Sequence, residues 1–547
     1  MQLKTALFAP NARPSQFAMM RIVPAAILVL LNTATIALAA EVAASLPIVR
    51  VAQGEVRGVQ QTGVTAFLGV PYAAAPVAAN RWRDPQPLSA WQRPLMADHY
   101  GHSCYQSQFS VPPWTHEYVD QESISEDCLY LNIWTPTVSR AARMPVLFWI
   151  HGGAFVGGAS SVPIYNGATL ARRGIVVVSI NYRVGAFGFL AHPELSRESA
   201  AQASGNYGLL DILAALRWVH RNIRAFGGDA DQVTIAGQSA GAAAVMALLQ
   251  MPQAHALFKR AIAESGPVLP VRKRDLRAAE AAGQALAVTL GAADIATLRA
   301  MPAERIQAAI SGPPQFGPVL DGWLLHADLA MPDRGAVVND VPILTGLAAN
   351  ERGPGSPLED FGGPPVAATL ANYADKVTHD FGADAAQILR VYPATDDTQT
   401  VTVARRLARD RGIAAVVHWG YERKRHARSA VFVYMYNHVE PGPNSERDGA
   451  FHTSEVPFVF GTLDAAPERG FDASERRFSK QMQRYWVNFV RSGDPNGNGQ
   501  PAWPAFTADD PRFMVLDKRF EARQLLSDEQ LRAFDAVLQH GGRLDIL

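Results

Sequence analysis

The sequence predicts an α/β fold with a large, mostly parallel central sheet flanked by helices. Residues 145–150 and 175–180 are continuously apolar, which is typical of parallel strands covered on both faces. From residue 207 to 226 apolar side chains recur at helical spacing, and a short β-branched strand follows at 232–236. This alternation of strands and helices indicates a doubly wound sheet.

The composition excludes several classes of protein. Of the 547 residues 48% are hydrophobic, which is enough for a large core. Basic and acidic residues number 50 each, so no overall charge favours nucleic acid as a partner. The absence of a fixed repeat excludes solenoids and propellers, and no shift in composition marks a second domain.

The N-terminus has the features of an export signal. Arg21 precedes an apolar run at 22–31, and Ala37-Leu38-Ala39 is a small-x-small cleavage pattern. We expect residues 1–40 to be removed, with translation starting at Met19 or Met20 as an alternative to residue 1. Residues 41–547 would form one domain that is periplasmic or secreted and has no membrane span. The other interpretation, a retained anchor, is disfavoured by the short apolar run.

The remaining elements follow from local patterns. Early in the chain, residues 49–51 and 54–59 indicate a hairpin, 66–72 a strand, and 126–134 a half-buried strand. The later elements are a helix at 165–173, helices within 273–310, a strand at 341–346, a helical cap insertion at 356–427, a strand at 430–436, a last strand at 513–516 and a helix at 527–538.

The stretch Gly237-Gln238-Ser239-Ala240-Gly241 lies between the strand at 232–236 and an alanine-rich helix at 242–250. A strand, a Gly-x-Ser-x-Gly turn and a helix make a nucleophile elbow. The two glycines permit a turn too tight for a Cβ, which exposes the Ser239 hydroxyl. An ordinary Gly/Ser turn is the alternative, and the rest of the chain decides against it.

Two further residues complete a catalytic order of serine, acid and histidine. Glu351 follows the strand at 341–346, and His452 follows the strand at 430–436, so each lies at the carboxyl end of a predicted parallel strand. Glu359 and Asp360 are rival acids, whereas Glu455 follows His452 too closely to serve. After the strand at 145–150, a glycine pair can turn backbone N–H groups toward an oxyanion.

Several motifs occur together with these residues. They are Gly69-Val70-Pro71-Tyr72-Ala73, Glu126-Asp127-Cys128-Leu129-Tyr130-Leu131-Asn132, the run from Asn181 to Phe189, and Phe226-Gly227-Gly228-Asp229 before the elbow. In these the chain resembles the type-B carboxylesterase and cholinesterase family of α/β hydrolases over nearly all of its mature length. The resemblance implies an α/β-hydrolase fold with a small N-terminal sheet, hydrolysis of carboxylic esters, and no metal or organic cofactor.

The resemblance also implies roles for individual residues. Ser239 would be the nucleophile, His452 the general base, and Glu351 the acid that orients it. The oxyanion donors would be the backbone N–H groups of Gly153, Ala154 and Ala240. Gln238, Glu455 and Ser265 would lie around the triad and support it.

The two cysteines, Cys104 and Cys128, predict a disulfide, since an even pair closing a short loop is usual in exported chains. Two buried free thiols are the alternative. The resemblance pairs the same cysteines, and it pairs Arg81 with Glu126 and Arg183 with Asp211.

One position departs from the family pattern: Gln238 stands where glutamate is usual. We therefore expect weak electrostatic preference for cationic, choline-type esters. Trp114 and Tyr118, between the cysteines, could offer a cation–π contact, with packing as the alternative.

The sequence does not identify the substrate. Loops at 267–271, 313–316 and 356–365 are expected to form its pocket, and their small or apolar residues suit a neutral, mostly apolar ester. Arg272, Lys273 and Arg352 could instead bind a carboxylate. Amide, carbamate or thioester hydrolysis would use the same machinery, and a non-catalytic binding protein on the same fold is a further alternative.

Overall fold

The computed structural model describes residues 47–107, 113–267, 274–310, 316–326, 338–353, 358 and 366–546. The predicted export signal and most of the three expected pocket loops, with Arg272 and Lys273, lie outside this part. The rival acids Glu359 and Asp360 also lie outside it. Residues 47–547 form one compact unit, whereas the predicted boundary after residue 40 stays a prediction.

The central feature is an eleven-stranded sheet of the order β16-β15-β14-β13-β12-β11-β9-β10-β8-β4-β3. From β15 to β10 every neighbouring pair is parallel. The outer strands pair antiparallel. The strands are β3 Val59–Gln61, β4 Val64–Pro71, β8 Tyr130–Thr135, β9 Met144–Ile150, β10 Val176–Ile180, β11 Gly228–Gln238, β12 Arg260–Glu264, β13 Ile343–Ala348, β14 Val431–Tyr436, β15 Phe513–Leu516 and β16 Phe520–Arg523.

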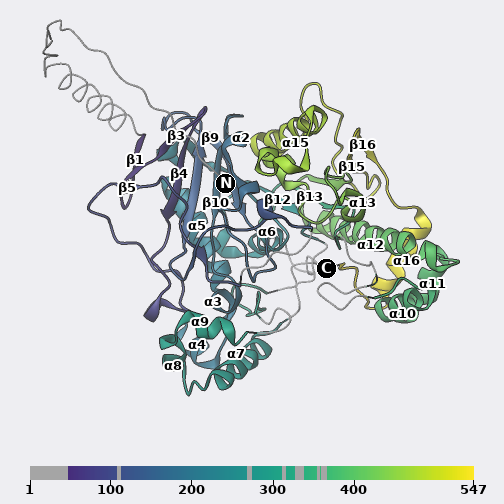
Figure 1. The fold of residues 1–547 in the computed structure, drawn as a ribbon, viewed down its shortest axis with the longest axis horizontal. Coiled ribbons are helices and arrows are strands. Elements are labelled where there is room, and N and C mark those ends of the chain that lie inside the picture. Colours follow the sequence, from purple (N-terminus) through teal and green to yellow (C-terminus); the bar gives the residue numbers. More distant parts are fainter. Residues whose placement is uncertain are drawn as a thin grey trace, which may run out of the picture. The chain divides into compact units, whose positions relative to one another are not determined.

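Smaller sheets and the helices surround this sheet (Figure 1). The small sheets are β1 Ile48–Val51 with β2 Gly54–Arg57 and β5 Leu95–Met96, and β6 Ser103–Cys104 with β7 Ile124–Ser125. The α-helices are α2 Ala168–Ala171, α3 Gly185–Phe189, α4 Pro193–Glu198, α5 Tyr207–Asn222, α6 Ala240–Gln250, α7 Leu276–Leu290, α8 Ile295–Ala300, α9 Ala303–Ala308, α10 Leu370–Phe381, α11 Ala385–Val391, α12 Asp397–His426, α13 Ser445–Asp448, α14 Val456–Phe460, α15 Ala473–Ser492 and α16 Asp528–Gln539.

Both faces of the parallel strands are buried, as their continuous apolar runs predict. In β9 the side chains of Val146, Phe148 and Ile150 join a core cluster that contains residues of α5 and α6. The intervening Leu147 and Trp149 join a second cluster with residues of α2 and α15. Because successive strand residues point to opposite faces, one apolar run supplies both cores.

Two groups of short helices extend from the sheet (Figure 1). One contains α4, α7, α8 and α9, and Ser196 of α4 donates to Glu280 of α7 at 2.5 Å. The other contains α10, α11 and α16, where Ser527 and Gln530 form a capping box. Helices α7, α8 and α9 lie in the predicted helical region at 273–310, and α10, α11 and α12 lie in the predicted insertion at 356–427. Helices α4 and α16 come from other parts of the chain.

The expected long-range pairs are present in the described residues. Cys104 and Cys128 form a disulfide. The guanidinium of Arg183 holds both carboxylate oxygens of Asp211 at 2.7 Å inside the core. Arg81 contacts Glu126 and also donates to the carbonyl oxygen of Met301 at 2.6 Å, which ties the N-terminal region to the end of α8.

Three predictions of strand structure were wrong in detail. The strand expected at 126–134 begins at Tyr130 and is almost entirely buried, because it lies between β10 and β4. Strand β12 was missed, since Arg260-Ala261-Ile262-Ala263-Glu264 is short, alanine-rich and charged at its ends. The strand at 513–516 is not the last, because β16 folds back on it antiparallel.

Two helices also differ from expectation. The long helix α15 was missed because its sequence is largely polar, with one apolar stripe that faces the sheet. The helix expected at 165–173 is only the short α2. Within the described residues no helix combines the length and the apolar character that crossing a membrane requires.

Candidate active site

The elbow at Ser239 has the strained backbone that the Gly-x-Ser-x-Gly turn predicts. Ser239 lies between β11 and α6 with φ 56° and ψ −127°, a conformation rare for a residue with a side chain. A Cβ on Gly237 would lie 2.5 Å from the carbonyl carbon of Gly241, and one on Gly241 would lie 2.0 Å from the oxygen of Ile150. Only glycine fits at both positions, so the turn presents Ser239 at the carboxyl edge of the sheet.

Glu351 and His452 meet at the same edge. Nδ1 of His452 forms a very short hydrogen bond with Oε2 of Glu351. The other oxygen of Glu351 accepts from the Ser265 hydroxyl at 2.6 Å and from the backbone N–H of Ala348 at 2.7 Å. Both side chains are buried. The carboxylate is therefore held on three sides and orients the imidazole.

Asn350 connects the two loops that carry this pair. Its backbone N–H donates to the carbonyl oxygen of Ala450 at 2.9 Å, and its side-chain amide donates to the carbonyl oxygen of Asp448 at 2.6 Å. The loop after β13 is thus joined directly to the loop after β14. Sequence reasoning did not select Asn350, because nothing local distinguishes it from an ordinary loop asparagine.

The far nitrogen of the imidazole contacts Gln238. The side-chain nitrogen of Gln238 lies 3.1 Å from Nε2 of His452, and both residues are buried. Among the described residues, no hydrogen bond joins the Ser239 hydroxyl to His452. The structure thus places Glu351, with Ser265 behind it, on one side of the histidine, and it places Gln238 on the nitrogen that a serine nucleophile would use.

The predicted oxyanion donors lie on a strained loop after β9. Gly153, Ala154 and Phe155 have φ of 109°, 54° and 61° in succession. A Cβ on Gly152 would lie 3.0 Å from that of Ser239, so this loop approaches the elbow closely. Ala240, the third predicted donor, begins α6 directly after Ser239. The loop after β9 and the start of α6 therefore border the serine.

His151, at the start of this loop, is held neutral. It stacks on Tyr182 with ring centroids 4.4 Å apart, and Nδ1 lies 2.7 Å from the carbonyl oxygen of Gly152. Burial lowers the pKa of His151 to about 4. The residue is a structural support of the loop rather than a second base.

Two further carboxyls are buried near the triad. Glu264, at the end of β12, accepts from the indole N–H of Trp486 at 2.7 Å, and its other oxygen has no partner among the described residues. Both oxygens of Glu455 are likewise buried without a described partner. Burial raises the pKa of Glu264 to about 8, and burial with the charge of Glu264 raises that of Glu455. Burial thus favours the protonated form of each carboxyl, and the two carboxyls disfavour each other's ionisation.

The segment between the cysteines packs against the histidine loop. The indole N–H of Trp114 donates to the carbonyl oxygen of His452 at 3.1 Å. The ring of Tyr118 meets Phe451 edge to face, and its hydroxyl donates to Glu440 at 2.7 Å. Arg469 lies over the Tyr118 ring, with its guanidinium carbon 5.6 Å from the ring centroid. Trp114 and Tyr118 thus pack within the protein, and the cation that Tyr118 contacts is an arginine of the same chain.

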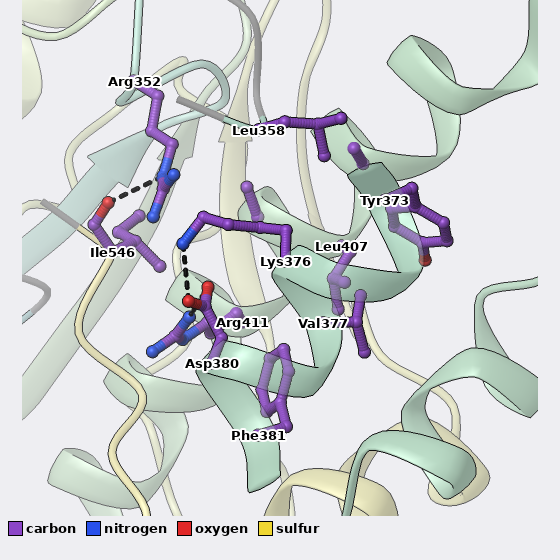
Figure 2. Close-up of a pocket in the computed structure, with 12 residues that line it drawn as sticks. Arg352, Leu358, Tyr373, Lys376, Val377, Asp380, Phe381, Leu407, Arg411 and Ile546 are labelled. Carbon is purple, nitrogen blue, oxygen red and sulfur yellow. Dashed lines mark hydrogen bonds and ion pairs between the residues drawn. The ribbon is translucent and has the colours of Figure 1, made fainter. Parts of the chain in front are cut away.

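A small cavity lies beside Arg352, between α10, α12 and Ile546 near the C-terminus (Figure 2). Its volume of about 30 Å³ suits one or two water molecules and excludes an ester. Lys376 and Arg411 both pair with Asp380, and Arg352 donates to the carbonyl oxygen of Ile546 at 2.9 Å. Arg352 thus ties the loop to the C-terminal segment.

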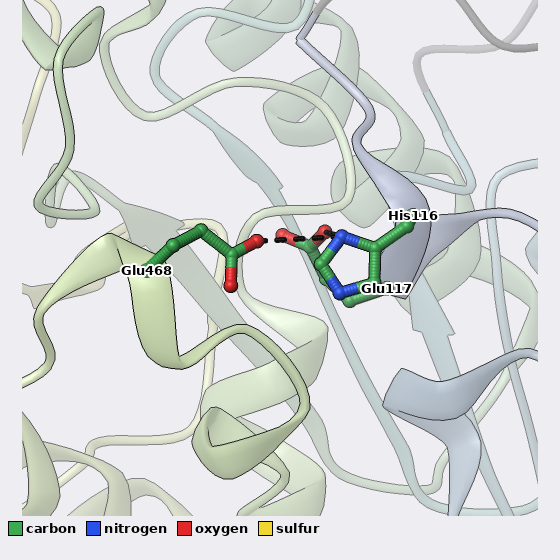
Figure 3. A group of neighbouring side chains, drawn as sticks. All are labelled: His116, Glu117 and Glu468. Atoms are coloured by element: carbon green, nitrogen blue, oxygen red, sulfur yellow. Dashed lines mark ion pairs between the residues drawn. The ribbon is translucent and has the colours of Figure 1, made fainter. Parts of the chain in front are cut away.

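A second cluster joins His116, Glu117 and Glu468, whose ligand atoms lie close enough for a metal ion (Figure 3). Nδ1 of His116 lies 3.6 Å from Glu117 and 3.3 Å from Glu468. However, Glu117 already pairs with Arg469 at 2.5 Å and accepts from the Thr115 hydroxyl. The cluster is a network of ion pairs that holds the segment between the cysteines.

The sheet and its strand–elbow–helix unit define an α/β hydrolase. The chain belongs to the carboxylesterase family, whose sequence profile matches residues 45–534. It is 37% identical over 474 residues to a fumonisin B1 esterase of Sphingopyxis macrogoltabida, with 83% of each chain covered. It is 33% identical over 491 residues to the para-nitrobenzyl esterase of Bacillus subtilis (strain 168), covering 86% of this chain and 94% of the relative.

A cholinesterase of Mus musculus is also related, at 33% identity over 515 residues, which cover 85% of this chain and 82% of the relative. The predicted family and fold are thereby confirmed. The protein is a carboxylic ester hydrolase that acts on small-molecule esters.

The protonated state of Glu264 makes stability depend on pH. The folded chain keeps this proton up to a pKa of about 8, whereas the unfolded chain releases it near 4.5. Folded stability therefore falls as pH rises from about 4.5 to 8. Glu264→Gln removes this loss and retains an acceptor for Trp486, so it should raise the unfolding midpoint more at pH 8 than at pH 5, as measured by thermal unfolding.

The exposed Glu521→Gln is the control and should leave the pH dependence unchanged. An equal change of midpoint at both pH values for Glu264→Gln would show that this carboxyl does not hold the proton.

Proposed function

We propose that Ser239, His452 and Glu351 form the catalytic triad of this esterase. The observation that carries the proposal is the contact between His452 and Glu351 at the sheet edge where the elbow presents Ser239. A serine hydroxyl becomes a useful nucleophile when an imidazole takes its proton, and the carboxylate stabilises the imidazolium that results. The contact between His452 and Glu351 near the elbow supports these roles.

The reaction has two halves. Ser239 Oγ attacks the ester carbonyl carbon while its proton passes to Nε2 of His452, and the imidazolium then protonates the departing alcohol. Water attacks the acyl-enzyme by the same route and releases the acid. In each half the N–H groups of Gly153, Ala154 and Ala240 hold the negative oxygen, and one such donor contributes roughly 3 kcal/mol.

Gln238 sets a condition on this mechanism. Nε2 of neutral imidazole accepts one hydrogen bond, and in the free enzyme the Gln238 amide lies 3.1 Å from that atom. The amide therefore releases Nε2 before Ser239 is deprotonated. Because glutamine carries no charge, it also adds no field that would attract a cation.

Ser239→Ala should abolish covalent labelling by a fluorophosphonate and lower kcat for p-nitrophenyl acetate by at least about a thousandfold, since the nucleophile is lost. Intact-protein mass and initial rates measure both effects. Ser492→Ala, an exposed serine at the end of α15, is the control and should label fully. Labelling of Ser239→Ala at the rate of the unchanged protein would refute the assignment.

We further propose that the preferred substrates are neutral esters. Gln238→Glu would place a charge beside the site, and a unit charge about 10 Å from a cation contributes roughly 1.7 kcal/mol at an effective dielectric constant of 20. The ratio of kcat/KM for acetylcholine over its neutral analogue 3,3-dimethylbutyl acetate should therefore rise by about tenfold. A strong preference of the unchanged protein for acetylcholine over the neutral analogue would contradict the proposal.

The natural ester is best sought with a panel that varies acyl length and alcohol size. Fumonisin B1 belongs in that panel, because an esterase with that name shares 37% identity with this chain.

We also propose that the chain is exported to the periplasm or secreted. The signal-like residues 1–40 and the disulfide between Cys104 and Cys128 support this, since disulfides persist in oxidising compartments. In a Gram-negative host, the mature protein should begin near Ala40 or Glu41 and leave the cell in the osmotic-shock or medium fraction. N-terminal sequencing checks this, and an uncleaved cytosolic product would contradict it.

A further inference from the structure

The oxyanion loop, residues 152–158, has a strained backbone that depends on contacts with other parts of the chain. Two of its three non-glycine residues, Ala154 and Phe155, have positive φ, and each such residue carries roughly 1–3 kcal/mol of strain. Strain of this kind persists only where surrounding contacts over-determine the conformation. The contacts that hold the loop therefore decide where its N–H groups point.

The backbone N–H of Gly185 donates to the carbonyl oxygen of Phe155 at 2.7 Å. Gln106, a residue that no motif singled out, supplies the side-chain contacts at the other end of the loop. Its side-chain oxygen accepts from the backbone N–H of Gly158 at 2.6 Å, and its side-chain nitrogen donates to the carbonyl oxygen of the same glycine at 3.0 Å. The nitrogen also donates to the carbonyl oxygen of Cys104 at 3.0 Å. The Gln106 side chain thus accepts one hydrogen bond from Gly158 and donates another to it. It also joins this glycine to Cys104 of the disulfide.

The Gln106 side chain, which clamps Gly158, is buried and closely fitted. Gln106 is 7% exposed. A Cβ on Gly157 would lie 2.7 Å from the Gln106 side-chain oxygen, so the glutamine lies flat against residues 157 and 158. Without it, the N–H and carbonyl groups of the half-buried Gly158 would lose these partners, which is unfavourable.

Gly158 in turn sets the position of the donors. A Cβ on Gly158 would lie 2.5 Å from the oxygen of Gly152, so the two ends of the loop touch. The carbonyl oxygen of Gly153 accepts from the N–H groups of Val156 and Gly157 at 2.9 and 3.0 Å. A shift of Gly158 therefore moves the peptide planes of Gly153 and Ala154.

We propose that Gln106 is a positioning residue for the oxyanion hole. This inference rests on the proposed function, in which the N–H groups of Gly153 and Ala154 hold the negative oxygen. Gln106 touches no substrate and acts through Gly158. Because the donors are needed most when the carbonyl oxygen becomes charged, loss of the clamp raises the energy of the transition state and changes ground-state binding little.

The test uses the full-length enzyme with Gln106→Ala, Gln106→Met and Gln106→Glu. Methionine keeps the length and loses the hydrogen bonds, and glutamate keeps one acceptor but faces two carbonyl oxygens. For each variant, kcat and KM are measured per active site, counted by fluorophosphonate titration. The inhibition constant of a trifluoromethyl ketone, which forms a negatively charged tetrahedral adduct on serine, is measured in parallel.

We expect kcat to fall about 10- to 100-fold in all three variants, with KM changed less than about threefold. The inhibition constant of the ketone should rise by the same factor as kcat/KM falls. Gln121→Ala is the matched control: it lies between the same cysteines, is exposed, and its amide donates to the carbonyl oxygen of His116. It should behave as the unchanged enzyme.

The outcomes separate the two proposals. If Ser239→Ala remains active, the triad assignment itself is wrong. The other case is that Ser239→Ala is inactive and Gln106→Met has fewer active sites by fluorophosphonate titration, but each site keeps normal kcat and normal ketone inhibition. Gln106 is then merely structural and the inference is overturned. Should Gln106→Ala fail to fold, the methionine and glutamate variants decide the question.

Discussion

The hydrogen bond between His452 and Glu351 is the contact on which the site depends. Its residues are 101 positions apart in the chain, and they meet because β13 and β14 are parallel neighbours whose carboxyl ends share one edge of the sheet. Asn350 then joins the two loops directly. A shift of one residue in this register would turn the strand side chains to the opposite faces, so the packing of both cores protects the geometry of the pair.

The same edge concentrates backbone strain. Non-glycine residues with positive φ follow three adjacent strands: Ala154 and Phe155 after β9, Ser239 after β11, and Ser265 after β12. Each is held by a partner from elsewhere, as when the N–H of Ser239 donates to the carbonyl oxygen of Glu264 at 3.0 Å. Strain at functional positions is thus balanced by a rigid scaffold, which fits a site that must be organised before substrate arrives.

Charge in the site is kept low. Glu351 has the imidazole as its partner, whereas burial favours the protonated forms of Glu264 and Glu455. Gln238, on the other side of the imidazole, carries no charge. Because Gln238 and the protonated forms of Glu264 and Glu455 are neutral, the developing oxyanion is the main charge to be stabilised. This is consistent with neutral esters as substrates.

Local sequence alone determined the parallel strands, the elbow and the order of Ser239, Glu351 and His452, because apolar runs and tight glycine turns are properties of neighbouring residues. It missed β12 and α15, whose burial depends on what packs against them. Only the tertiary structure decided which polar groups support the site: Gln106 reaches Gly158 across 52 positions and Trp114 reaches His452 across 338. Such contacts leave no periodicity or motif in the chain, since they arise where distant loops converge at one edge of the sheet.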